Sequence, residues 1–518
     1  MSLRSRVAVG ALALATPVLA TGLASQAATA DTPPPPVLKL SAPAKQVVYA
    51  DGTSVYGGFG LRLVNSGGPF ELRVTRPDYD NAPQAYERIG GVDVALPTDL
   101  PVSFNELGSF LSLKFTPLGT NPNKAFFRRI GSCIGQQADR VDPAAPAESD
   151  YPTQCSYSPY ALGSLMGIQQ GYAASVTDQW GGAPIRVPAG RWQVTMAVAW
   201  PWARALDIPA ANRTVTSTVV VRRQSGCIVD RVAARGCRAV ARTTPRPAQP
   251  SGVRPSAQRA ITAGELPPGT PLPDLRALPA TGFQISPNGN FLRFSATVWN
   301  GGTSPMVVDG FRTGDLTMDG YQYFFGPDGK QLPDYVKVGT FEWDARPTHL
   351  HWHFKSFAAY SLLPLGVTPQ PAGHAHDVGG VDSRKEAFCL ANTDAVDLAG
   401  PGADTNPGNT DLATACGDYT SLSTREVLAA GWGDTYAQFR AGQSFDLRKL
   451  PNGCYNVWVE GNPVVNATTG ARTLIESDTT NNQAKRRICI GGRTDHRTIR
   501  SIQKIGLVDD PGYAYQGD

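Results

Sequence analysis

Three histidines occupy alternate positions in Thr-His-Leu-His-Trp-His-Phe, residues 348–354, and they constrain the fold more than any other stretch. Aromatic and β-prone residues surround them and no helical period fits, so the pattern predicts a strand over 349–362. Because successive side chains of a strand point to opposite faces, His349, His351 and His353 would project from one face. On a flat strand the outer two Cα atoms would lie about 13 Å apart, so the strand must twist or bulge before all three imidazoles can share one ion.

Three imidazoles on one strand face indicate a metal site. Neutral imidazole suits copper, zinc, nickel and iron, and the Irving–Williams order ranks Cu(II) highest. The spacing alone does not choose between copper and zinc. The alternative is an ordinary aromatic strand with polar histidines, which is the better interpretation of a lone histidine but not of three in alternation.

Residues 1–30 have the pattern of a secretory signal peptide. Arg4 and Arg6 form its charged region, residues 7–20 its apolar region, and small residues its cleavage site before Asp31. No later apolar stretch approaches the length of a membrane span, so we expect a secreted, extracellular protein without one. Removing the two arginines lowers the formal net charge of +4 by two, and a chain so close to neutral lacks the basic stripe of a nucleic-acid-binding protein.

The eight cysteines predict disulfide bonds, because export permits them. No pair has the Cys-x-x-Cys spacing of a zinc knuckle or a redox site. Neighbourhood in the sequence indicates four pairs: Cys133–Cys155, Cys227–Cys237, Cys389–Cys416 and Cys454–Cys489.

With 518 residues the chain is expected to hold more than one domain. Residues 239–273 are rich in Pro, Gly and Arg and lack aromatic residues, which predicts a linker. Short apolar runs between turn residues on both sides of it predict a mainly β protein. We expect an N-terminal β-sandwich of unknown role over 31–238, a β-rich domain over 274–491 and a C-terminal tail over 492–518. Helical pattern is scarce, and 423–430 is the best candidate.

The second half of the chain resembles the catalytic domain of the copper-dependent lysyl oxidase family. The resemblance covers roughly residues 274–490, and its landmarks agree with the family in order and spacing. The landmarks are the histidine strand, Leu-Pro-Asp-Leu at 272–275 with Leu-Arg-Phe at 292–294, Lys385 three positions before Phe-Cys-Leu, Gly-Trp-Gly-Asp-Thr-Tyr at 431–436, and Glu-Ser-Asp-Thr-Thr-Asn-Asn at 476–482.

The resemblance implies a copper-dependent amine oxidase. In that family a tyrosine is oxidised near copper to a quinone and a lysine adds to its ring, giving lysyl tyrosylquinone; here these residues are Tyr436 and Lys385. The quinone supplies an electrophile, so primary amines become aldehydes at the expense of O₂, with release of hydrogen peroxide and ammonia. Asp434, two positions before Tyr436, is our candidate for the catalytic base. A lysine-containing protein, a free diamine and a small monoamine all remain open as the substrate.

A calcium site is also implied. The oxygen-bearing side chains of 476–482 suit Ca²⁺, although an Asn/Asp-rich hairpin turn is the alternative. Such a site would join the first segment of the domain to the last. The ligands implied by the resemblance are Asp274, the carbonyl of Leu275, Glu476, Asp478, Asn481 and Asn482.

Two positions depart from the pattern of animal members of the family. Arg384 stands where they carry a histidine before the lysine, and Thr348 stands where a cysteine precedes their first copper histidine. These differences bear on the disulfide pattern and on the surroundings of the substrate amine. They leave the three histidines, Lys385 and Tyr436 in place.

Two other functions stay open at this point. A zinc or copper hydrolase or dioxygenase could use the three histidines with an open metal position, and it would need neither Lys385 nor Tyr436. A non-catalytic surface module could hold the metal for stability and bind its partner through the N-terminal sandwich. Taken alone, Lys385 would be a surface lysine and Tyr436 a core tyrosine.

Overall fold

The structure is a computed structural model that describes residues 34–55, 59–136, 138–177, 185–223, 261–346, 350–383, 385 and 387–508. These residues all belong to one compact unit, Pro34–Asp518. The predicted signal peptide, the predicted pair Cys227–Cys237, residues 239–260 of the predicted linker and His349 lie outside the described residues. The predicted division into two domains stays a prediction.

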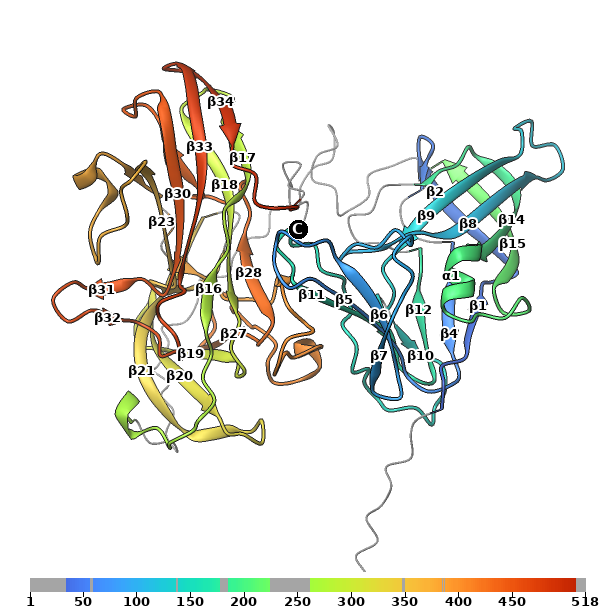
Figure 1. The fold of residues 1–518 in the computed structure, drawn as a ribbon, viewed down its shortest axis with the longest axis horizontal. Helices are drawn as coiled ribbons and strands as arrows, with labels where there is room; N and C mark the ends of the chain where they lie inside the picture. The colour runs from blue at the N-terminus through green and yellow to red at the C-terminus, as the bar shows by residue number, and fades with distance from the viewer. Residues whose placement is uncertain are drawn as a thin grey trace, which may run out of the picture. The chain divides into compact units, whose positions relative to one another are not determined.

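The fold is mainly β, as the sequence predicts (Figure 1). Residues 34–223 form three sheets, and several of their strands alternate inward apolar and outward polar side chains, as in β5, where Phe70, Leu72 and Val74 are buried. One α-helix, α1 (Trp200–Ala205), lies among them. In spatial order the sheets are β1 (Leu38–Ser41), β4 (Arg62–Asn65), β12 (Tyr172–Ser175), β10 (Asp139–Arg140); β11 (Gly163–Ile168), β5 (Phe70–Thr75), β6 (Gln84–Ile89), β7 (Val92–Ala95); and β13 (Ile185–Arg186), β3 (Ser54–Val55), β2 (Lys45–Asp51), β15 (Thr214–Arg223), β14 (Gly190–Val198), β8 (Leu107–Pro117), β9 (Phe126–Ser132).

Residues 261–508 form three larger sheets and a small hairpin. Three short 3₁₀ helices lie between strands: η1 (Ala263–Glu265), η2 (Ala375–Val378) and η3 (Pro407–Asn409). The first sheet has the spatial order β16 (Leu275–Ala277), β18 (Phe291–Asn300), β28 (Trp432–Tyr436), β26 (Asp394–Ala395), and β17 (Thr281–Ile285) and β29 (Ser444–Asp446) also pair with β18. The second, which carries the histidines, has the order β25 (Ala387–Phe388), β22 (His351–Lys355), β21 (Gln331–Asp344), β20 (Thr317–Phe325), β19 (Met306–Arg312), β27 (Ser423–Leu428). The third has the order β24 (Val381–Asp382), β23 (Ala358–Pro364), β30 (Gly453–Gly461), β33 (Gln483–Arg493), β34 (His496–Ile502), and the hairpin is β31 (Val464–Asn466) with β32 (Ala471–Arg472).

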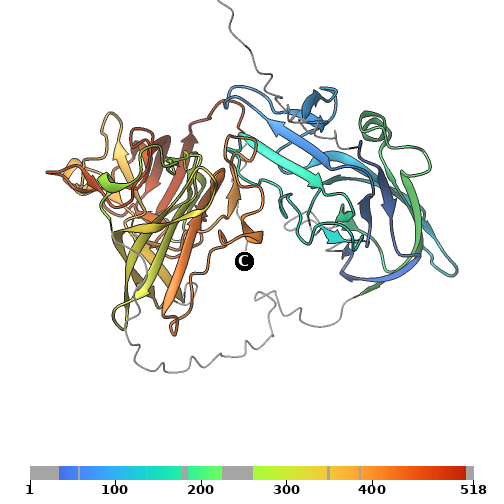
Figure 2. The ribbon, with the colours of Figure 1, turned by 90° about the horizontal axis from the view of Figure 1, so that it is seen from below.

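The core of this second group lies between two of its sheets. Strand β16 packs against β30 and β33, and β18 packs against β30 (Figure 1; Figure 2 shows the same ribbon from below). Phe294 on β18 meets Tyr360 on β23 edge to face, with 5.3 Å between ring centroids. Both rings belong to one continuous buried cluster, which also takes in Phe354 and Phe388 from the histidine-bearing sheet. The apolar core therefore holds the histidine strand β22 against the sheets that contain β18 and β23.

Two secondary-structure predictions are wrong. Residues 423–430 do not form a helix, because Ser423–Leu428 is the edge strand β27, paired with β19 along its length. The predicted strand 349–362 is two strands, β22 and β23, separated at Ser356, whose φ of 61° turns the chain. In both places pairing with a neighbouring strand decides the structure, which a local pattern does not reveal.

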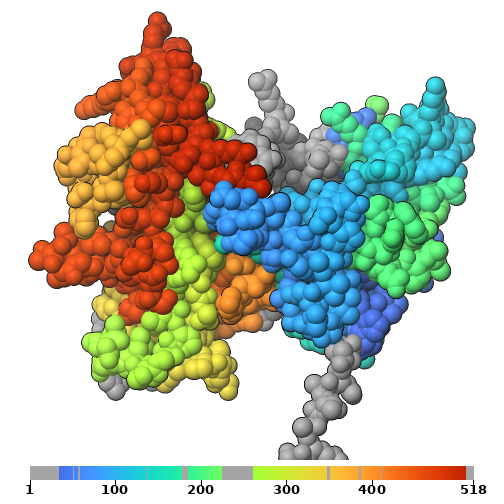
Figure 3. Space-filling model, in the orientation of Figure 1, coloured from blue at the N-terminus to red at the C-terminus, as the bar shows by residue number. Residues whose placement is uncertain are grey.

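Three of the four predicted disulfides are confirmed: Cys133–Cys155, Cys389–Cys416 and Cys454–Cys489. Within the described part of the chain, no helix is long and apolar enough to cross a membrane. Residues 496–502, within the segment predicted as a tail, form β34 and pair with β33. This hairpin is coloured red in Figure 3.

Candidate metal and cofactor site

The histidine strand begins later than predicted. β22 starts at His351, and the preceding Leu350 has a φ of 52°, in the left-handed region. The strand alternation that predicted one shared face therefore covers His351 and His353 only. The bend that a site of three histidines requires lies at Leu350, directly after His349.

His351 and His353 lie on the same side of β22, with 4.7 Å between their ring centroids. His353 is fully buried, and its Nδ1 lies 3.2 Å from Oδ2 of Asp344, which ends the neighbouring strand β21. Carboxylates beside imidazole nitrogens commonly orient metal-binding histidines. The two rings therefore fit a metal site of the expected kind. Sequence reasoning missed Asp344, whose only signal is the register that pairs it with His351.

Lys385 and Tyr436, which are distant in sequence, lie together. The Nζ atom of Lys385 is 4.6 Å from the centre of the Tyr436 ring and 5.3 Å from that of Phe388. Two strand pairings produce this: Phe388 pairs with Phe354 of the histidine strand, and Tyr436 pairs with Ala296 of β18. The rings of Phe388 and Tyr436 then meet edge to face at 4.7 Å.

The environment of Lys385 favours its neutral form. Its side chain is buried, and Nζ has no hydrogen-bond partner among the described residues. Burial, helped by the positive charge of Arg346, lowers the pKa of Lys385 to about 7. A large share of the amine is therefore unprotonated near neutral pH, which is the form that acts as a nucleophile.

The backbone of Cys389 positions the Tyr436 hydroxyl. The hydroxyl oxygen accepts the Cys389 N–H at 2.7 Å, and the Cys389 carbonyl lies 3.3 Å from it. Burial raises the pKa of Tyr436 well above its ordinary value. Cys389 is bonded to Cys416, whose carbonyl accepts the N–H of Trp352 on the histidine strand at 3.1 Å. The Cys389–Cys416 disulfide thus connects the backbone that binds the Tyr436 hydroxyl to the strand that carries the histidines.

Besides Asp344, two buried carboxyl groups lie within electrostatic reach of Lys385. One is Asp434, the predicted base; burial raises its pKa well above the usual range while the charge of Lys385 lowers it. The other, Glu426 on β27, was missed by sequence reasoning, which took residues 423–430 as the best candidate for a helix. Burial likewise raises the pKa of Glu426, whose Oε2 accepts the Leu390 N–H at 2.9 Å. The site therefore offers two candidate proton acceptors.

The six residues of the predicted calcium site come together. Asn481 Nδ2 donates to Asp274 at 2.9 Å and to Asp478 at 3.1 Å. Oε2 of Glu476 accepts the Leu275 N–H at 2.8 Å, and its other oxygen accepts Nδ2 of Asn482 at 2.8 Å.

The donor set fits a hard cation. The Oδ1 atoms of Asn481 and Asn482 are buried and accept no hydrogen bond from the described residues, beside the carboxylates of Asp274, Glu476 and Asp478. Such oxygens are the ligands that Ca²⁺ prefers. The role of the Leu275 carbonyl stays a prediction.

Adding Ca²⁺ to protein stripped with a chelator should raise its melting temperature with calcium concentration, because the ion binds the folded cluster only. At about 100 times the dissociation constant the gain is about 2.7 kcal/mol, or several degrees, which differential scanning calorimetry resolves. Asn481→Ala should remove most of the shift. Asn466→Ala, at the exposed end of β31, is the control and should keep it. Identical melting curves with and without calcium would exclude the site.

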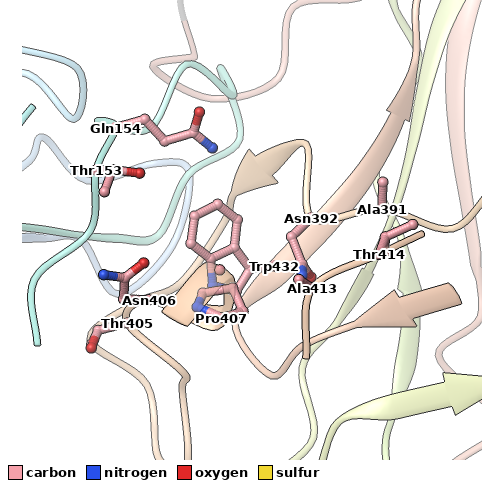
Figure 4. A pocket seen from close by; sticks show the side chains of 11 residues that line it. Thr153, Gln154, Ala391, Asn392, Thr405, Asn406, Pro407, Ala413, Thr414 and Trp432 are labelled. Atoms are coloured by element: carbon pink, nitrogen blue, oxygen red, sulfur yellow. The ribbon is translucent and has the colours of Figure 1, made fainter. Parts of the chain in front are cut away.

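Lys385 lines a cavity of about 440 Å³, which it shares with Trp458, Glu460 and Asp382. Its wall also carries Arg472, which pairs with Glu460 at 3.5 Å. Another cavity, of about 310 Å³ beside Trp432, is lined by uncharged side chains, Asn392 and Thr414 among them (Figure 4). Of these two cavities, only the first is lined by Lys385.

No protein-family model matches this chain, and no curated protein matches it. A functional assignment therefore depends on the geometry around Lys385, Tyr436 and the histidine strand.

Proposed function

We propose that the protein is a secreted, copper-dependent amine oxidase of the lysyl oxidase type, which converts primary amines, water and O₂ to aldehydes, hydrogen peroxide and ammonia. The observation that carries the proposal is the position of Lys385 Nζ, 4.6 Å from the centre of the Tyr436 ring. An ordinary surface lysine is not buried without a hydrogen-bond partner, and burial of an unpaired amine costs stability. Secretion is supported by the pattern of residues 1–30 and by three disulfides.

Copper held by His349, His351 and His353 would supply the oxidising chemistry at the Tyr436 ring, and lysyl tyrosylquinone made from Tyr436 and Lys385 would supply the electrophile for the amine. The residues of the chain prepare this chemistry. Asp344 orients His353, and the Cys389 backbone holds the Tyr436 hydroxyl. Tyr436, one of the chain's 17 tyrosines, is also the one with Lys385 Nζ over its ring.

Lys385 has the protonation state that the cross-link needs. A neutral amine carries a lone pair, and burial at a pKa of about 7 keeps that form populated at neutral pH. A lysine in water, with a pKa near 10.4, would be almost wholly protonated there. Burial therefore serves the reaction at the cost of an unpaired polar group.

Two carboxyl groups can take the proton that amine oxidation removes from the substrate. The pKa values of Asp434 and Glu426 are raised by burial, so the ionised form of either is a stronger base than a carboxylate in water. We assign Asp434 the base role, since it is on the same strand as Tyr436. After burial, the charge of Lys385 has the largest effect on the pKa of Asp434. The cavity lined by Lys385 and Glu460 is the path for the substrate amine.

The proposal is tested by loading the full-length protein with copper in air. Phenylhydrazine, which forms coloured adducts with quinones, should label the protein, and digestion should release one cross-linked pair of peptides that contains Lys385 and Tyr436. Lys355→Ala, which removes an exposed lysine from the histidine strand, is the control and should still form the pair. Amine oxidation by a protein whose Lys385 and Tyr436 peptides are unmodified would overturn the assignment.

The same experiment has a defined pH dependence. Because the pKa of Lys385 is lowered to about 7, its neutral fraction rises about tenfold from pH 6 to pH 8 and changes little above that. If copper is bound first without O₂ at one pH, the initial rate of cross-linking after a jump in pH should follow this curve. A rate that continues to rise toward pH 10 would indicate an ordinary, exposed lysine.

A further inference from the structure

We propose that His374, His376 and Asp382 form a second metal site, separate from the histidine strand, that takes a divalent transition-metal ion of the zinc class. The donor atoms of the three side chains all lie within 4.8 Å of one another. Nδ1 of His374 is 3.8 Å from Oδ2 of Asp382, and the two imidazole rings are nearly parallel, at 25°, with centroids 5.4 Å apart.

The backbone holds these side chains together. His374 precedes η2 and His376 lies within it, so only Ala375 separates them. The Ala375 N–H donates to Oδ2 of Asp382 at 2.8 Å, and the Gly380 N–H donates to the Ala375 carbonyl at 2.7 Å. The turn depends on Gly380, because a Cβ there would lie 2.5 Å from the Leu362 carbonyl oxygen. The segment is thus a closed turn rather than a loose loop.

The donor set selects the class of ion. Two imidazoles and one carboxylate are the ligands of many zinc sites that keep an open position, with bonds of about 2.0–2.2 Å. Bonds of that length require donor atoms about 3.3–3.6 Å apart in a tetrahedron, and rotation of the exposed histidine side chains achieves this. Asp382 is already oriented by the Ala375 N–H, as ligands of protein metal sites commonly are. One other carboxylate is near: Oδ1 of Asp377 lies 3.3 Å from Nε2 of His376.

The site is open to solvent and lies between two cavities. His374 and His376 are about 70 % exposed, and the segment that carries them, gold in Figure 3, is at the surface. Asp382 lines both cavities: the one that Lys385 also lines and a second, of about 720 Å³, beside Asp446 and Arg448. An ion bound here is therefore accessible from outside and is not part of the Lys385–Tyr436 pair.

Zinc chloride is the probe. The full-length protein is stripped of metal, titrated with zinc by calorimetry, desalted and analysed for zinc. The wild type should bind one more zinc per chain than His374→Ala, and the residual affinity of the variant at this site should be at least about 100-fold weaker, since even outer-shell changes weaken metal sites 10–100-fold. Asp382→Asn should also lose the zinc, although its amide oxygen can still accept the Ala375 N–H and preserve the turn.

The control is His496→Ala. His496 is also exposed and lies 2.9 Å from a carboxylate, Asp495, but it has no second imidazole in its cluster, so its removal should leave the zinc count unchanged. The difference between wild type and His374→Ala does not depend on what the histidine strand binds, and it stands whether or not a quinone forms. Equal zinc counts and equal affinities in wild type, His374→Ala and Asp382→Asn would overturn the site.

Discussion

Tyr436→Phe should abolish amine oxidation, the phenylhydrazine adduct and the cross-linked peptide together, while copper stays bound. The substitution removes the ring oxygen from which the quinone is made and leaves the histidines untouched. It also leaves the Cys389 N–H without the acceptor it has at 2.7 Å, which costs about 1–3 kcal/mol. A melting curve must therefore show that the variant is folded before its activity is compared with that of the wild type.

Tyr360→Phe is the matched control for this prediction. Tyr360 is buried in the same aromatic cluster and packs on the same Phe388 ring, 5.8 Å away, but it has no lysine over its ring among the described residues. This variant should keep the colour and most of the activity. Lys385→Ala should also lose activity and the cross-linked peptide. It keeps Tyr436, so its tyrosine can still be oxidised, but only to a different quinone. Retention of amine oxidation by Tyr436→Phe would favour a metal-only reaction such as the hydrolase or dioxygenase alternative.

His351→Ala should remove most of the bound copper. Loss of this imidazole leaves His353 and His349, and the affinity for Cu(II) should fall by at least about 100-fold, because even outer-shell changes cost 10–100-fold. His351 is only partly buried, so the truncation leaves a smaller hole than removal of the fully buried His353. Elemental analysis of the desalted protein and the Cu(II) signal in electron paramagnetic resonance measure the loss.

Asp344→Asn gives the intermediate case. The amide can still contact Nδ1 of His353 but no longer supplies a negative charge, so we expect a weakening of about 10–100-fold instead of a loss. His496→Ala, on the far strand β34, should bind copper as the wild type does. One tightly held copper in His351→Ala would show that the ion is bound elsewhere.

The sequence predicts those parts of the site that lie in local patterns. Alternation places His351 and His353 on one face, and the mainly β class follows from short apolar runs between turns. The alternation begins only after Leu350, whose φ of 52° is left-handed and which precedes the strand. The Lys385–Tyr436 pair was available only through the resemblance, since the 4.6 Å approach results from two separate strand pairings.

Residues whose roles arise from pairing between strands were not predictable. Glu426 belongs to an edge strand on which Thr424, Glu426 and Leu428 all face inward, so a charged residue occupies a buried position that a polar pattern assigns to solvent. Asp344 is ordinary in sequence and gains its place only from the register of β21 with β22. Buried carboxyl groups of this kind break the local rules where a site needs them.

Contacts between distant parts of the sequence hold residues 261–508 together, and they affect how this part of the chain can fold. Glu476 bonds to Leu275 across 201 positions, and Ser295 bonds to Gln438 across 143. Contacts of such high sequence separation give a high contact order. Folding is then slow, because the entropy of closing long loops is lost before the contacts that stabilise them form. During synthesis, strand β18 emerges well before β28, which carries Tyr436, and its edge stays unpaired until then. The nascent chain therefore exposes this sheet edge while residues 301–431 are made, and Tyr436 can pair with β18 before strands β30, β33 and β34 have been synthesised.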